Sequence, residues 1–132
     1  MSKMTVEVVT PERVVYSGQA SMVIARGVQG DLGILPKHMP MVTPLKIAPV
    51  QIKVEGDNVV RMAVSGGFME VRGDKVTILA ETAEMPGDID VERAKASKGR
   101  AEKRLSEKYP ELDVQRAERS LQRALARIDV AK

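Results

Sequence analysis

The hydrophobic pattern of this chain changes its period once, near residue 87. Before that point, short runs rich in β-branched residues alternate partly with polar residues, which is typical of half-buried β-strands. After it, apolar residues recur at spacings of three and four, which is typical of amphipathic helices. A chain of 132 residues with one such change is expected to contain a β domain over residues 1–87 and a helical domain over residues 88–132.

The first domain contains many short strands. Gly, Pro or Asx residues separate them, and residues 56–58 and 72–74 have the composition of hairpin turns. No stretch of helical periodicity interrupts the strands. Many short strands at such spacing favour an antiparallel β-sandwich or a flattened barrel. The expected strands are residues 5–10, 22–25, 50–54, 59–64, 68–71 and 76–80.

The second domain predicts two helices in an antiparallel hairpin. Pro110 separates them, because the residue before a proline disfavours the α region. The first helix has a narrow Ala-rich seam, and Gly99 within it costs about 1 kcal/mol relative to Ala. Because short helices bury little area against each other, the hairpin needs the β domain, a partner or a ligand to stay closed. The apolar positions are Val91, Ala94, Ala101 and Leu105 in the first helix, and Val114, Ala117, Leu121, Ala124, Leu125 and Ile128 in the second.

The composition excludes several classes of function. The chain contains no Cys, which rules out disulfides, thiolate chemistry and Cys-based metal sites. Aromatic residues make up only 2% of the chain, so few side chains could stack on nucleic-acid bases. The first residues lack the apolar core of a signal peptide, and no run of eighteen apolar residues occurs. Any association with a membrane is therefore expected to go through a partner.

The net charge of +3 is carried entirely by the second domain. Residues 1–87 contain nine Lys or Arg and nine Asp or Glu, whereas residues 88–132 contain twelve basic and nine acidic residues. A basic helical domain is consistent with an acidic partner. A solvated surface of mixed charge is the alternative interpretation.

A six-residue pattern occurs twice and opens both predicted helices. Residues 89–94 read Ile-Asp-Val-Glu-Arg-Ala, and residues 112–117 read Leu-Asp-Val-Gln-Arg-Ala. One interpretation is a helix start, with an apolar residue, an Asp cap and good helix formers. The other is that one copy binds an anionic ligand and the second copy only resembles it.

Two motifs in the first domain carry a family resemblance. Residues 30–40 read Gly-Asp-Leu-Gly-Ile-Leu-Pro-Lys-His-Met-Pro and predict a tight loop between strands. Residues 64–71 read Val-Ser-Gly-Gly-Phe-Met-Glu-Val and are followed by the strand at residues 77–80. With the two-part organisation, these motifs make the whole chain resemble the epsilon subunit of bacterial F-type ATP synthases. The resemblance implies a β-sandwich of about ten strands followed by a helical hairpin, and a non-catalytic role.

The resemblance also implies partners. In the family, this subunit lies on the central stalk, bound to the gamma subunit, and its sandwich touches the membrane-embedded c-subunit ring. Asp31 matches the loop that meets the ring. The helices either fold on the sandwich or extend into the alpha/beta catalytic hexamer, where they impede ATP hydrolysis. The expected location is peripheral, on the cytoplasmic face of the bacterial cell membrane, with no contact to nucleic acid.

ATP is the ligand that the resemblance implies for the hairpin. Family members bind ATP at a motif of Ile or Leu, Asp, two variable residues, Arg and Ala, which residues 89–94 match. Guanidinium groups from both helices could converge on a triphosphate only when the hairpin is closed. No Walker-type loop is present, so the expected role is binding without hydrolysis, and the need for Mg²⁺ is open. The residues carried over are Ile89, Asp90, Arg93 and Ala94 from the motif, with Glu84, Arg100, Arg123 and Arg127 around it.

Three functions are compatible with this sequence. The first is a regulatory and coupling subunit of a proton-translocating ATP synthase, and the second is a stand-alone ATP-sensing module. The third is a basic helix pair that binds nucleic acid, which the low aromatic content disfavours. Asp113 and Arg116 of the second copy are expected to begin a helix and bind no nucleotide. His38 and Ser65 are assigned no chemistry, because neither has a partner residue placed by the sequence.

Overall fold

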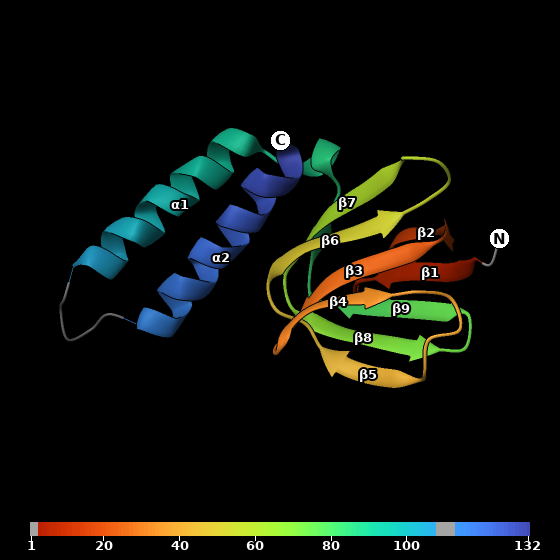
Figure 1. The fold of residues 1–132 in the computed structure, drawn as a ribbon. Helices are drawn as coiled ribbons and strands as arrows, with labels where there is room; N and C mark the ends of the chain where they lie inside the picture. Colours follow the sequence, from red (N-terminus) through yellow and green to blue (C-terminus); the bar gives the residue numbers. More distant parts are fainter. Residues whose placement is uncertain (1–2, 108–112) are drawn as a thin grey trace.

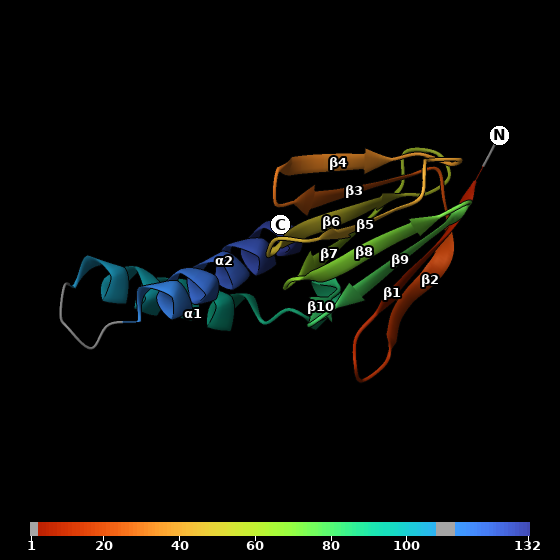
Figure 2. The ribbon, with the colours of Figure 1, turned by 90° about the horizontal axis from the view of Figure 1, so that it is seen from below.

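Two five-stranded sheets and two long helices make up the molecule (Figures 1 and 2). The computed structural model describes residues 3–107 and 113–132. The predicted β-sandwich followed by a helical hairpin is confirmed. The strands are β1 (Met4–Val9), β2 (Val14–Ala20), β3 (Met22–Gly27), β4 (Gly30–Ile34), β5 (Met41–Pro44), β6 (Ala48–Lys53), β7 (Val59–Val64), β8 (Gly67–Arg72), β9 (Lys75–Ala80) and β10 (Ala83–Glu84).

The order of the strands is β2-β1-β9-β8-β5 in the first sheet and β10-β7-β6-β3-β4 in the second. We call these sheet A and sheet B. All paired strands are antiparallel except β1 and β9, which run parallel with Val9 opposite Leu79. This pair departs from the predicted antiparallel arrangement. Parallel neighbours need a long connection, and here the chain visits both sheets between them.

The core lies between the two sheets, and in β1, β3, β6, β8 and β9 it comes from every second residue. In β1, for example, Met4, Val6 and Val8 are buried while their neighbours are partly exposed. Branched aliphatic residues and Met fill this core in place of aromatic rings. Gly67 begins β8 at a φ of +109°, and a Cβ there would lie 2.0 Å from the backbone oxygen of Leu79. Only Gly therefore allows β8 to start this close to β9.

Four strands lay outside the sequence prediction, and one of them corrects it. The segment predicted as a loop at residues 30–40 begins with β4, so Asp31 lies on a strand directly after the turn that joins β3 to β4. The pattern of β4 is weak because two of its five residues are Gly. Pairing with β3, rather than local propensity, makes this segment a strand. The other unpredicted strands are β2, β5 and β10.

A short 3₁₀ turn, η1 (Pro86–Asp88), leads from the sandwich into the hairpin of α1 (Val91–Ser106) and α2 (Val114–Ala131). The hairpin is closed: α1 packs on α2, and α2 lies on β6 and β7 of sheet B (Figure 1). The predicted break at Tyr109 and Pro110, and the start of the second copy at Leu112, lie outside the described residues. None of the helices in residues 3–107 and 113–132 has the length and apolar character needed to cross a bilayer.

The apolar face predicted for the second helix is partly wrong. Val114 and Leu125 are exposed, whereas Ala126 and Val130 are buried in a cluster with Ala63 of β7. The reason is that α2 packs against two neighbours. Its small residues turn towards α1 and sheet B, so a single stripe does not describe what it buries.

Candidate functional site

The same hydrogen bond begins both long helices. Asp90 Oδ1 accepts from the backbone N–H of Arg93 at 3.0 Å, and Asp113 Oδ1 accepts from the backbone N–H of Arg116 at 3.0 Å. Each aspartate is thus an N-cap that satisfies an otherwise unpaired helix donor. The repeated motif is therefore a helix start in both copies, as the first interpretation proposed. Any difference in ligand binding must come from what surrounds each copy.

A cavity of about 260 Å³ opens beside the first copy, and five of the predicted site residues line it. They come from three parts of the fold: β10 of the sandwich, the start of α1, and α2. These parts meet only because the hairpin is folded against the sandwich. The lining residues are Glu84, Asp88, Asp90, Arg93, Ala94, Ser97 and Arg127.

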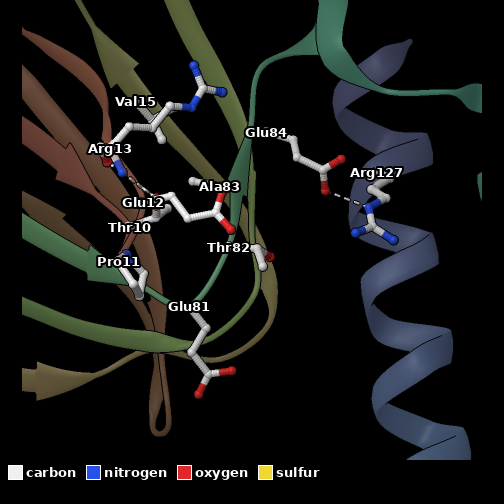
Figure 3. Close-up of a pocket in the computed structure, with 10 residues that line it drawn as sticks. All are labelled: Thr10, Pro11, Glu12, Arg13, Val15, Glu81, Thr82, Ala83, Glu84 and Arg127. Carbon is white, nitrogen blue, oxygen red and sulfur yellow. Dashed lines mark hydrogen bonds and ion pairs between the residues drawn. The ribbon is translucent and has the colours of Figure 1, made fainter.

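The contact between Glu84 and Arg127 joins the sandwich to α2. Arg127 Nε donates to Glu84 Oε1 at 2.6 Å, and both side chains are about one-third exposed. Figure 3 shows this pair at one end of a second cavity of about 310 Å³, whose other residues come from the β1–β2 loop, the start of β2, the segment before β10 and β10 itself. The charge-assisted hydrogen bond between Glu84 and Arg127 therefore borders both cavities.

The remaining predicted residues lie outside the first cavity. Ile89 is buried against Ala63 of the sandwich, where it anchors the start of α1. Arg100 donates to Ser97 Oγ at 3.0 Å, which places it next to a residue that lines the cavity. Arg123 donates to Ser120 Oγ at 3.2 Å on its own helix. The structure thus brings two of the four predicted arginines into the cavity and a third to its border.

Asp31 lies far from this cavity in the chain and belongs to a different surface. Its carboxylate accepts a hydrogen bond from Arg26 Nε at 3.1 Å across the β3–β4 pair. Both side chains are exposed. This end of the sandwich also exposes Val28, in the turn between the two strands.

Asp88 and Ser97 line the cavity but were not predicted. Ser97 follows Arg93 by four residues, so it lies one turn further along the same face of α1. That spacing could have identified it from the sequence. Asp88 ends the η1 turn, and nothing in the local pattern indicates that its side chain reaches the cavity.

The charges that line the cavity determine how a triphosphate could bind there. Two guanidinium groups face three carboxylates, so the lining alone has a net charge of −1. Arg127 is also held by Glu84. A polyanion would have to draw Arg127 from this carboxylate and recruit Arg100 from the border. The donors suit phosphate oxygens, while Glu84 and Asp88 suit hydroxyl or amino donors of a nucleoside.

A second surface feature lies on the outer face of sheet A. Strand register places five apolar residues in one line across all five strands. Phe68 and Leu79 of this line are 53% and 51% exposed, which is unusual for adjacent large side chains. We call it the apolar row. Its members, in order, are Pro44, Phe68, Leu79, Val9 and Val14.

Two family models together cover nearly the whole chain. Residues 3–86 match the beta-sandwich domain of the ATP synthase delta/epsilon chain, and residues 88–132 match its long alpha-helix domain. A solved mitochondrial ATP synthase from Euglena gracilis contains a chain of the same fold, with a TM-score of 0.84 at 19% identity. That match covers 99% of this chain and 82% of the other.

Curated relatives align over the full length. The ATP synthase epsilon chain of Brevibacillus brevis is 82% identical over 132 residues, which is 100% of both chains. That of Halalkalibacterium halodurans is 55% identical over 99% of this chain and 98% of its own. The chain therefore belongs to the family of epsilon chains of bacterial F-type ATP synthases, which are non-catalytic subunits of the complex.

Proposed function

We propose that this central-stalk subunit binds ATP between its closed hairpin and its sandwich, and that its open hairpin inhibits ATP hydrolysis. The observation that carries the proposal is the shared cavity of Glu84, Arg93 and Arg127. One residue comes from the sandwich and one from each helix. A ligand that contacts all three binds only the closed form and stabilises it by mass action.

The open state of the hairpin is the one that inhibits ATP hydrolysis in this proposal. Residues 88–132 carry the entire net positive charge of the chain, and an open hairpin exposes more of it. Such a basic element can enter the acidic surroundings of the alpha/beta catalytic hexamer. ATP then acts as a signal: abundant nucleotide keeps the hairpin closed, and scarce nucleotide releases it.

Isothermal titration of ATP into the purified chain tests the site, with and without Mg²⁺. Arg93→Ala removes one guanidinium from the cavity and is expected to weaken binding by about tenfold or more. Arg116→Ala is the matched control, because Arg116 holds the equivalent position in the second copy. It is expected to change the affinity by less than about twofold.

Two results would contradict the ATP site. One is the absence of heat at millimolar ATP, and the other is an equal loss of affinity in both variants. Because the isolated chain suffices, the measurement does not depend on the rest of the complex.

The partners that we propose are the gamma subunit, the c-subunit ring and, in the open state, the alpha/beta hexamer. The apolar row on sheet A is the surface that we assign to gamma, since its exposed side chains are uncovered in the isolated chain. Asp31 and the neighbouring turn are assigned to the ring. Membrane contact then goes only through the complex, at the cytoplasmic face. Failure of gamma to co-purify under native conditions would overturn this assignment.

A further inference from the structure

A groove of about 710 Å³ separates α2 from one end of the sandwich and takes no part in the ATP site. On the sandwich, residues 45–47, Arg26 and the β7–β8 turn form one wall. Arg119 and Gln122 of α2 form the other. The groove therefore exists in this form only while the hairpin is closed.

The groove is lined with more positive than negative charge. Arg26, Lys46 and Arg119 face a single carboxylate, that of Glu81. Within the part of the chain that the structure describes, Lys46 and Arg119 form no salt bridge, whereas Arg26 pairs with Asp31. Cations on both walls of one groove repel each other, so an acidic group between them would relieve the repulsion.

The groove also continues the apolar row. Phe68 belongs to both, and Leu45 of the groove follows Pro44 of the row. The row crosses five strands, so it spans roughly 19 Å at about 4.8 Å per strand spacing. A helix of about thirteen residues has that length at 1.5 Å per residue.

We propose that the row and the groove together receive an acidic, amphipathic helix of the stalk partner. Its apolar stripe covers the row, and carboxylates at one of its ends reach Lys46 and Arg119. This inference rests on the proposed association with gamma and extends it to the hairpin. Because Arg119 is on α2, the partner binds the closed form more tightly, and partner binding and hairpin closure stabilise each other.

The affinity of the chain for the purified gamma subunit of the same complex tests this inference. Charge reversal by Lys46→Glu or Arg119→Glu is expected to weaken binding by about tenfold or more, with a smaller effect at high salt. Arg116→Glu is the matched control, since Arg116 is exposed on the same helix outside the groove. It is expected to weaken binding by less than about threefold. Circular dichroism on heating checks that each of the three variants folds as the wild type does.

A second readout follows the hairpin itself. Because the chain has no Cys, spin labels on Asp57→Cys and Glu107→Cys report the distance from the far end of the sandwich to the end of α1. Adding gamma is expected to narrow the distribution of distances between the two labels and to shift it towards the value of the closed hairpin. Equal affinities for Arg119→Glu and Arg116→Glu, or opening of the hairpin by gamma, would overturn the groove contact. Wild-type protein that does not bind gamma at all would instead overturn the proposed partner.

Discussion

Asp90 and Asp113 make the same cap hydrogen bond. Comparing substitutions at the two positions therefore distinguishes an effect on helix stability from an effect on ligand binding. Replacing either with Ala removes the acceptor for one helix N–H and is expected to destabilise the chain by about 1 kcal/mol. Only Asp90→Ala is expected to weaken ATP binding, because Asp90 also lines the cavity. Urea unfolding measures the first effect, and titration with ATP measures the second.

Asn caps a helix about as well as Asp, which provides the control for this pair. Asp90→Asn is expected to keep the stability of the wild type while it removes one negative charge from the cavity. If Asp113→Ala reduced ATP affinity as much as Asp90→Ala, the effect would come from the helices in general. The first copy would then have no special role.

At the scale of elements, one ion pair attaches α2 to the sandwich away from the cavity. Arg61 of β7 donates to both the side chain and the backbone oxygen of Asp129, each at 3.2 Å. Both side chains are partly exposed, so their coupling is expected to be about 0.5–1 kcal/mol. Arg61→Ala should therefore shift the hairpin towards the open form without changing the cavity residues.

Hydrogen exchange of the α2 amides measures this shift. Exchange is expected to accelerate in Arg61→Ala, while the core strands of the sandwich keep their protection. A double-mutant cycle with Asp129→Ala isolates the pair from other effects of either substitution. Unchanged exchange in α2 would mean that the buried cluster of Ala63, Ile89, Ala126 and Val130, with the Glu84–Arg127 pair, holds the helix without Arg61.

For the whole molecule, the sequence predicted the features that local patterns determine. It missed the features that depend on pairing between segments far apart in the chain. The two-part architecture and both helix starts follow from hydrophobic period and caps, which are local. The strand at Asp31 and the parallel pairing of β1 with β9 depend on neighbours far along the chain. The same distinction holds for the candidate site. Motif spacing led to Arg93, but only the folded chain brings Asp88 to it and leaves Arg123 beside Ser120.

The closed hairpin and the proposed inhibitory state exclude each other, which allows a test on the assembled complex. Ala63 of β7 and Ala126 of α2 lie in one buried cluster, and the chain has no other thiol to compete with a new pair. Ala63→Cys with Ala126→Cys should form a disulfide under oxidising conditions and hold α2 on the sandwich. A mobility shift on a non-reducing gel shows that the bond has formed.

Oxidised complex is expected to hydrolyse ATP without inhibition by this subunit, and reduction is expected to restore the inhibition. The single variant Ala126→Cys, treated with the same oxidant, controls for oxidation elsewhere in the complex. Equal inhibition by the locked and reduced forms would show that the hairpin inhibits without leaving the sandwich.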